Sequence, residues 1–319
     1  MINNISVRVV GKVSEAVDIC SFELASADGR PLPPFSAGSH IDVLVSDTIT
    51  RQYSLCNDPA ETDRYVIGVL RDPGSRGGSL AMHDAVKAGD IIEISAPKNH
   101  FPLLHAERIL LFAGGIGVTP ILCMAERLSA IKANFSMHYC TRSPERTAFL
   151  ERIKASDFSS RVTFHHDAGP AEQRLDLPAL IATPEPGTHL YVCGPAGFIS
   201  HVVDTAKSLG WDSSQIHFEY FGAAPQDTSH DTGFEVKLAS SGRVYAIPAD
   251  RTVFQVLDEH GVDIPVSCEQ GVCGTCITRV LSGTPDHRDA YFTDEERAAN
   301  DQFTPCCSRS LSKLLVLDL

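Results

Sequence analysis

The chain has 319 residues, of which 43% are hydrophobic and 21% charged, so it is long enough to bury the cores of two or three globular domains. Its formal net charge of −13 argues against nucleic acid as a partner, because phosphate binding needs clustered Lys and Arg. There is no apolar run long enough to span a membrane and no export signal at the N-terminus, so we expect a soluble cytoplasmic protein.

Residues 1–103 are predicted to form an antiparallel β-barrel, because short strands alternate with Gly and Pro turns. Three of these strands are expected at Ile5–Val10, Ile41–Val45 and Tyr65–Leu70. A short helix from Ser79 to Val86 and a strand from Ile91 to Ile94 are expected to follow.

Two short motifs in this region have side chains suited to a phosphate and a flat ring. The run Arg51-Gln52-Tyr53-Ser54-Leu55 offers a guanidinium, an aromatic face and a hydroxyl. The run Arg76-Gly77-Gly78-Ser79 is a Gly-rich turn before a helix, where free amides favour a phosphate. Taken alone, the first motif is more often a strand with an exposed Arg, and the second is more often an ordinary turn.

Residues 104–224 are predicted to form a doubly wound α/β domain with a parallel sheet, because strands and helices alternate. Four segments have the character of buried strands: Ile109–Phe112, Phe135–Cys140, Val162–His165 and His189–Cys193. Thr119 is the expected N-cap of the first helix and Pro120 its first residue. Later helices are expected near Thr147–Ala155 and Gly197–Leu209.

Glycines follow two of these strands at the sheet edge where a dinucleotide would bind. They are Gly114, Gly115 and Gly117 after the first strand, and the glycine of Cys193-Gly194-Pro195 after the fourth. The first group is not a G-x-G-x-x-G fingerprint. Cys193 is also compatible with a small buried hydrophobic residue.

Residues 225–233 are polar and rich in turn formers, which predicts a linker. Residues 234–319 are predicted to form an α+β domain. Phe234–Leu238 and Val244–Ile247 have the alternation of a hairpin, and Thr252 is the expected N-cap of a helix closed by Gly261.

Four cysteines of this last region have the spacing of a plant-type [2Fe-2S] site: Cys268, Cys273, Cys276 and Cys306. Gly271 and Gly274 give the loop the freedom to bring sulfurs to iron while amides point back. Zinc typically uses a second C-x2-C or an H-x3-5-H pair, which is absent, and disulfides are not expected without an export signal. Cys307 is an alternative fourth ligand, although the spacing favours Cys306.

Together, these motifs and His217–Gly222 resemble the family of phthalate dioxygenase reductases and vanillate O-demethylase reductases. The resemblance covers essentially the whole chain. It implies a ferredoxin-reductase-like barrel that binds FMN, an α/β domain that binds NADH, and a β-grasp ferredoxin domain with a [2Fe-2S] cluster, in that order.

The resemblance also implies roles for individual residues. Arg51, Arg76 and the turn Gly77-Gly78-Ser79 would hold the FMN phosphate, with Tyr53 and Ser54 beside the isoalloxazine and Ser54 near its N5 atom. The nucleotide site would be made by Gly114, Gly115, Gly117, Thr119, Pro120, Arg142, Cys193, Gly194 and Pro195. Thr119 and Cys193 would set the nicotinamide against the flavin, with Phe221 near the ring edge.

The dinucleotide preference is less constrained by these motifs. In the family an acidic residue often follows a Thr-Arg pair to hold the ribose, whereas here Ser143 follows Arg142 and Glu145 comes two residues later. A 2′-phosphate is therefore left open. NADH is favoured, because the resemblance is to NADH users and no further basic cluster surrounds Arg142.

A nicotinamide donates two electrons as a hydride and a cluster accepts one at a time, so a flavin between them makes chemical sense. The resemblance implies a separate Rieske-type aromatic oxygenase as acceptor, with Glu269, Gln270 and Val272 on an exposed loop facing it. Residues 234–319 carry thirteen acidic and eight basic side chains, which suits a basic partner and equally plain solubility. Two alternatives remain: a diiron monooxygenase or cytochrome P450 as acceptor, and a non-catalytic ferredoxin-like module.

Overall fold

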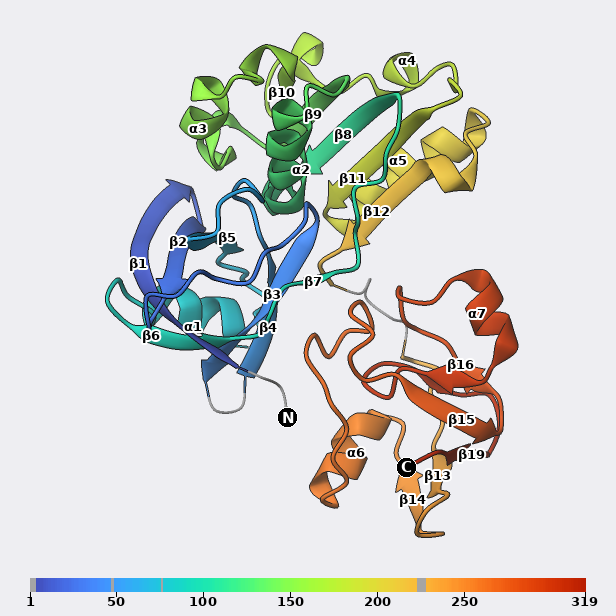
Figure 1. Ribbon diagram of the computed structural model, residues 1–319. Coiled ribbons are helices and arrows are strands. Elements are labelled where there is room, and N and C mark those ends of the chain that lie inside the picture. The colour runs from blue at the N-terminus through green and yellow to red at the C-terminus, as the bar shows by residue number, and fades with distance from the viewer. Residues whose placement is uncertain (1–3, 47–48, 76, 223–227) are drawn as a thin grey trace. The chain divides into compact units, whose positions relative to one another are not determined.

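The computed structural model of the chain describes residues 4–46, 49–75, 77–222 and 228–319 (Figure 1). The chain divides into two compact units, Met1–Glu219 and Tyr220–Leu319. We call them unit 1 and unit 2. Unit 1 includes both segments for which separate flavin and nucleotide domains are expected, so the boundary at 103/104 stays a prediction. No helix in the described ranges is long and apolar enough to cross a membrane.

The first part of unit 1 is an antiparallel sheet with the strand order β4-β3-β6-β1-β2-β5, in which β7 also pairs with β3. Its elements are β1 (Ile5–Ala16), β2 (Ile19–Ser26), β3 (Ser39–Ser46), β4 (Ile49–Ser54), β5 (Arg64–Leu70), α1 (Gly78–Asp84), β6 (Ile91–Ile94) and β7 (Lys98–Asn99). The strands expected from the sequence are present, and several of them extend beyond the predicted residues, as β1 does to Ala16.

The two end strands of this sheet approach each other. Leu55, just after β4, forms an antiparallel bridge with Ile67 of β5, and the Cys56 amide donates to the Val66 carbonyl over 2.9 Å. Alternate side chains of the strands point inward to a core that includes Ile41 and Phe22, both fully buried. The position of β4 next to β5 places the Arg51–Leu55 motif beside the turn before α1.

The second part of unit 1 is a five-stranded sheet with the order β10-β9-β8-β11-β12. The pairs β8–β9, β9–β10 and β8–β11 are parallel, as predicted. The elements are β8 (Arg108–Gly114), α2 (Val118–Ala130), β9 (Phe135–Thr141), α3 (Leu150–Ala155), β10 (Val162–His166), α4 (Leu177–Leu180), β11 (Thr188–Gly194), α5 (Ala196–Ser208) and β12 (Ile216–Tyr220). Short 3₁₀ turns at Gly115–Gly117, Pro144–Arg146, Ser159–Arg161, Ala171–Gln173 and Ser213–Gln215 connect some of them.

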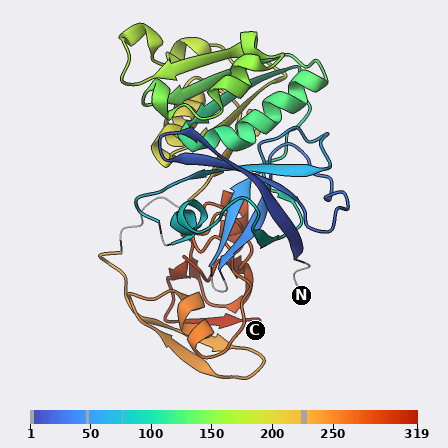
Figure 2. The ribbon, with the colours of Figure 1, turned by 90° about the vertical axis from the view of Figure 1, so that its left-hand side faces the viewer.

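The helix α2 lies between this parallel sheet and the N-terminal sheet (Figure 2). One hydrophobic cluster contains Leu111 of β8, Ile121 of α2 and Val66 of β5, so the two sheets of unit 1 share a core. The approach is close at two glycines. A Cβ at Gly38 would lie 3.2 Å from the Met124 methyl of α2, and one at Gly68 would lie 2.8 Å from the Thr119 methyl.

The start of α2 differs from the prediction that Thr119 caps it. Gly115–Gly117 forms a 3₁₀ turn that leads directly into the helix, so the N-cap is Gly117 and Thr119 is the second helical residue. The Thr119 hydroxyl donates to the Ile116 carbonyl over 3.2 Å instead of capping an amide. Pro120 is the third residue, where a missing N–H is still tolerated.

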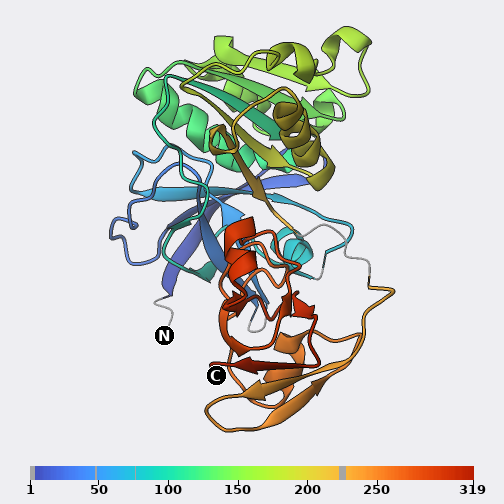
Figure 3. The same cartoon turned by 90° about the vertical axis from the view of Figure 1, so that its right-hand side faces the viewer.

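Unit 2 contains a mixed sheet with the order β14-β13-β19-β15-β17 and a separate pair, β16–β18. Its elements are β13 (Phe234–Leu238), β14 (Val244–Ile247), α6 (Val253–Glu259), β15 (Thr278–Ser282), β16 (Pro285–Asp286), α7 (Asp294–Ala299), β17 (Gln302–Phe303), β18 (Arg309–Ser310) and β19 (Leu314–Leu317). The predicted hairpin and the Thr252 cap, which forms a capping box with Gln255, are confirmed. The hairpin and α7 lie at opposite ends of the unit (Figure 3).

Candidate functional site

The thiols of the predicted cluster ligands converge in unit 2. The Cys306 thiol interacts with the thiols of Cys268 and Cys276, and the Cys268 thiol also interacts with that of Cys273. All four residues are buried. Cys268 comes from the loop after α6, Cys276 lies before β15 and Cys306 lies before β18, so the fold brings together ligands separated by up to 38 positions.

The backbone of the cysteine loop contains two glycines in the left-handed region and an amide directed at a cysteine sulfur. Gly271 and Gly274 both have φ +70°, the left-handed region that other residues avoid. The Gln270 amide donates to the Cys268 sulfur over 3.4 Å, and hydrogen bonds from the neighbouring thiols lower the pKa of Cys268. In the described ranges, no three His, Cys, Asp or Glu side chains are placed around a single metal ion. A two-iron cluster does not need this, because its four thiolates are divided between two irons.

Cys307 contacts this group through Cys306. Its sulfur contacts the Thr304 hydroxyl at 3.2 Å and lies 2.3 Å from the position of a Cβ on Gly271. It is half-buried, and among the cysteines its thiol interacts with that of Cys306. Cys306 contacts the thiols of Cys268 and Cys276, and its role as the fourth ligand stays a prediction.

The loop residues expected to face a partner are less exposed than predicted. Glu269, Gln270 and Val272 are all half-buried. Gly222 packs against this loop, since a Cβ there would lie 2.7 Å from the Gln270 side-chain oxygen.

The side chains predicted to bind a flavin phosphate come together in unit 1. A Cβ on Gly78 would lie 2.5 Å from the Arg51 side chain, so the guanidinium side chain lies directly on the turn before α1. Gly77 is the N-cap of α1, with φ +93°. The Ser79 hydroxyl is engaged by the Asp72 amide at 3.2 Å. Arg76 lies outside the described residues.

Tyr53 and Ser54 end β4 with side chains on opposite faces of the strand. Tyr53 packs against the core of the N-terminal sheet, and burial raises its pKa to about 12, so its phenol stays protonated. Ser54 is buried, and its hydroxyl lies 3.5 Å from the Glu219 carboxylate of β12. This contact joins the two sheets of unit 1.

Glu219 is a residue that the sequence reasoning did not single out. It lies within the run His217–Gly222, but nothing in the local pattern distinguishes its carboxyl from an ordinary solvent-facing one. Although part of the residue is accessible to solvent, its carboxyl group is tightly enclosed by protein atoms, and this desolvation raises its pKa to about 8. A titratable group therefore lies beside the hydroxyl predicted to contact the flavin.

The glycines at the ends of β8 and β11 allow two backbones to approach each other. A Cβ on Gly117 would lie 2.3 Å from the Cys193 carbonyl oxygen, and one on Gly194 would lie 2.9 Å from the Gly114 Cα. Gly115 has φ +52°. Cys193 is completely buried, which raises the pKa of its thiol well above the usual value. Pro195 is the N-cap of α5.

The remaining predicted nucleotide residues are spread more widely. Arg142 is exposed just after β9, at the same edge of the sheet as Gly114. Thr119 and Pro120 are buried, and the Thr119 methyl faces Gly68. Phe221 belongs to unit 2 and is 40% exposed, so its predicted place beside the flavin ring stays a prediction.

Two protein families match this chain. The 2Fe-2S iron-sulfur cluster binding domain matches residues 236–311, and the N-terminal domain of dimethylamine monooxygenase subunit DmmA-like proteins matches residues 100–216. The vanillate O-demethylase oxidoreductase of Pseudomonas putida is 56% identical over 313 residues, which are 98% of each chain.

Two solved structures are similar over nearly all of this chain. Phthalate dioxygenase reductase, described as a modular structure for electron transfer from pyridine nucleotides to [2Fe-2S], aligns with a TM-score of 0.79 and 42% identity, covering 99% of this chain and 98% of the other. An intact type IV self-sufficient cytochrome P450 monooxygenase aligns with a TM-score of 0.84 and 39% identity, covering 99% of this chain but 41% of the larger one.

Proposed function

The chain belongs to the family of vanillate O-demethylase oxidoreductases and phthalate dioxygenase reductases, and we propose that it passes electrons from NADH through FMN and a [2Fe-2S] cluster to a Rieske-type aromatic oxygenase. It is an electron-transfer oxidoreductase with a ferredoxin-like iron-sulfur region. The observation that carries the proposal is the convergence of four buried cysteine thiols, in one chain with a glycine-lined parallel sheet edge.

The residues around Arg51 fit a flavin phosphate. The side chain of Arg51, which donates to the Thr50 carbonyl at 2.7 Å, lies against the Gly77–Gly78 turn, so a guanidinium and the first amides of α1 lie close together. FMN, when bound, accepts a hydride and returns electrons singly. Tyr53 would support the ring, and Ser54, hydrogen-bonded to Glu219, would hold a proton at the ring edge.

On the nucleotide side, the residues of the chain would act by positioning the dinucleotide. The close contact of Gly117 with the Cys193 carbonyl fixes the glycine turn against the end of β11, and α2 begins directly behind it. Gly114, Gly115, Thr119, Pro120, Arg142, Gly194 and Pro195 complete the proposed site. Cys193, being neutral and buried, would exclude water there rather than act as a nucleophile.

We further propose that Cys268, Cys273, Cys276 and Cys306 are the ligands of the cluster. Buried thiols and loop amides directed at sulfur are the features that stabilise a cluster and set its potential. The proposed order of transfer follows from the number of electrons each group exchanges.

The proposed function is tested by the colour of the purified protein. Flavin and [2Fe-2S] absorption, about one FMN and two irons per chain, and bleaching of both by anaerobic NADH are expected. A colourless protein without iron, isolated under conditions that preserve clusters, would contradict the proposal.

A cytochrome P450 is the second candidate acceptor, because the same three-part fold occurs within a self-sufficient P450 monooxygenase. The reduced chain should be mixed with a Rieske oxygenase and with a separate P450, and the rate of cluster reoxidation followed. Faster reoxidation by the oxygenase supports the first proposal, and the reverse order supports the second.

A further inference from the structure

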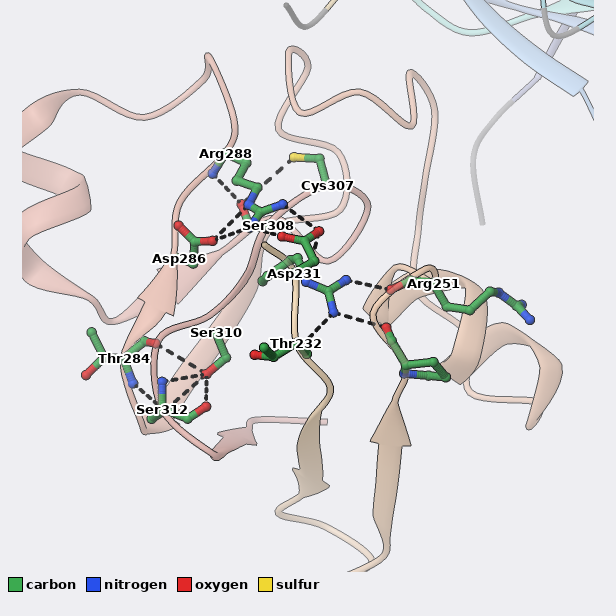
Figure 4. Close-up of polar contacts among 12 residues, drawn as sticks. Asp231, Thr232, Arg251, Thr284, Asp286, Arg288, Cys307, Ser308, Ser310 and Ser312 are labelled. Carbon is green, nitrogen blue, oxygen red and sulfur yellow. Dashed lines mark hydrogen bonds and ion pairs between the residues drawn. The ribbon is translucent and has the colours of Figure 1, made fainter. Parts of the chain in front are cut away.

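Asp231 makes a bidentate ion pair in unit 2, just before the first strand. Its two carboxylate oxygens accept hydrogen bonds from the Arg288 guanidinium at 2.6 and 2.9 Å, and the Arg309 Nε lies 3.5 Å away. Figure 4 shows Asp231 facing Arg288, with Asp286 on the other side of the guanidinium. The side chain of Asp231 is only 5% exposed. A paired, desolvated carboxylate of this kind is costly to leave unpaired.

Arg309 secures the same stretch of chain through backbone carbonyls. Its guanidinium donates to the carbonyls of Thr232, Pro248 and Arg251 at 2.9 to 3.0 Å. It also lies 5.2 Å from the centre of the Phe234 ring. Residues 231–232 are thereby attached to the turn before α6 through Arg309, as well as to Arg288 through Asp231.

The partners of Asp231 are directly connected to the cysteine cage. The Arg288 amide donates to the Ser308 hydroxyl at 3.1 Å, two residues after Cys306. Two residues beyond Arg288, the Ala290 amide donates to the Gly271 carbonyl in the cysteine loop at 3.0 Å. The cysteine loop and the segment after Cys306 are therefore both hydrogen-bonded to the backbone at Arg288 and Ala290, and the Arg288 side chain holds Asp231.

We propose that Asp231, Arg288 and Arg309 form a positioning clamp, which holds residues 231–232 against the segment that contacts both parts of the cysteine cage and so keeps the cluster in position to accept electrons. The inference rests on the proposed function, in which flavin and cluster exchange electrons within one chain. Release at Asp231 would remove the side-chain anchor of the described residues just before Phe234, where β13 begins, and would loosen the Arg288 segment that contacts the cage.

The clamp should affect one electron-transfer step and leave the preceding one unchanged. In the holoenzyme under anaerobic stopped flow, Asp231→Ala and Arg288→Ala should each slow flavin-to-cluster transfer by about tenfold, with NADH-to-flavin transfer unchanged. The double variant should be no slower than either single one, because the two residues act as a pair. Asp231→Glu, which keeps a carboxylate, should recover most of the rate.

Asp258→Ala is the matched control. It removes the same charge from an exposed site on α6, where the side chain makes no ion pair with another described residue. An unchanged flavin-to-cluster rate in Asp231→Ala, or an equal loss in Asp258→Ala, would overturn the clamp.

Hydrogen exchange separates failure of the clamp from failure of the proposed function. If NADH does not reduce the wild-type flavin, the proposed function is wrong. The clamp is then tested independently by the rate of backbone amide exchange. Amides in residues 228–233 should exchange at least about tenfold faster in Asp231→Ala than in the wild-type chain. Equal exchange would show that Asp231 does not hold this segment.

Discussion

The Glu219 carboxyl lies where its protonation bears on the candidate flavin site, 3.5 Å from the Ser54 hydroxyl. Burial raises its pKa to about 8, from the ordinary value of 4.5. Between these pH values the folded chain holds a proton that the unfolded chain has released. The stability from this residue is therefore fully present below pH 4.5 and is lost as pH rises through about 8.

Glu219→Gln should flatten this part of the pH dependence. Urea unfolding of the flavin-free protein between pH 5 and 8 should show a shallower fall in the free energy of unfolding, by at most about 1.4 kcal/mol for each pH unit. Glu172→Gln, at an exposed site, serves as the control and should keep the wild-type slope. A wild-type slope in Glu219→Gln would show that the carboxyl is ionised in the folded chain.

The two adjacent cysteines should respond differently to substitution. Cys306→Ser should lose the cluster, because its thiol contacts those of Cys268 and Cys276, whereas Cys307→Ser should retain it. Iron content and visible absorption after purification measure the result. The opposite pattern would mean that Cys307 is the fourth ligand.

The cysteines and the Arg51 motif could be identified from sequence because their chemistry depends on local spacing. Glu219 could not, because its partner Ser54 is 165 positions away and the contact exists only when β12 meets the end of β4. The sequence signal nearest to Glu219 was the run His217–Gly222, which is one of the motifs that carry the family resemblance.

At the scale of the elements, the turn between β8 and α2 has no room for a side chain at Gly117. Gly117→Ala would place a Cβ within 2.5 Å of three backbone atoms of Cys193 and Gly194, so the turn must move away from β11. We expect a loss of about 1–3 kcal/mol in stability and a clear rise in KM for NADH. Chemical denaturation and steady-state kinetics measure both.

Gly197→Ala is the corresponding control in α5. A Cβ there meets nothing within 4 Å, and Ala is favoured over Gly in a helix. Stability should stay the same or rise slightly, with KM for NADH unchanged. Equal behaviour of the two variants would contradict the proposed role of Gly117.

The order and type of the central elements followed from apolar periodicity, and the parallel pairing of β8, β9, β10 and β11 followed from their alternation with helices. The start of α2 did not. Thr119 is a good N-cap by residue type, but the 3₁₀ turn Gly115–Gly117 runs directly into the helix, and the Thr119 methyl lies against Gly68 of the other sheet. Contacts between segments far apart in the sequence are not contained in local propensity.

Across the whole molecule, the distribution of hydrophobic cores predicts two unfolding events. One core cluster joins the two sheets of unit 1, a second lies within the N-terminal sheet of the same unit, and a third lies wholly within unit 2. Calorimetry of the cofactor-free chain should therefore show two transitions, with the N-terminal and parallel sheets melting together. Three separate transitions would contradict a shared core in unit 1.

The acidic charge of the chain gives a second prediction at this scale. Residues 234–319 have thirteen acidic and eight basic side chains, so a basic acceptor would be attracted over a distance. Electron delivery to the oxygenase should slow several-fold between low salt and about 0.5 M salt, with NADH oxidation by the flavin little changed. A salt-independent delivery rate would assign the acidic surface to solubility alone.

The core shared by the two sheets also determines where this chain can be recombined with others. A junction near residue 103 would separate Gly38 and Gly68 from the side chains of α2 that fill the space beside them. A junction after Tyr220 and before Thr228 cuts through neither that core nor the Asp231 ion pairs. A chimeric reductase should therefore keep both sheets of unit 1 from the same parent. Its new iron-sulfur module should include that module's own counterpart of Asp231.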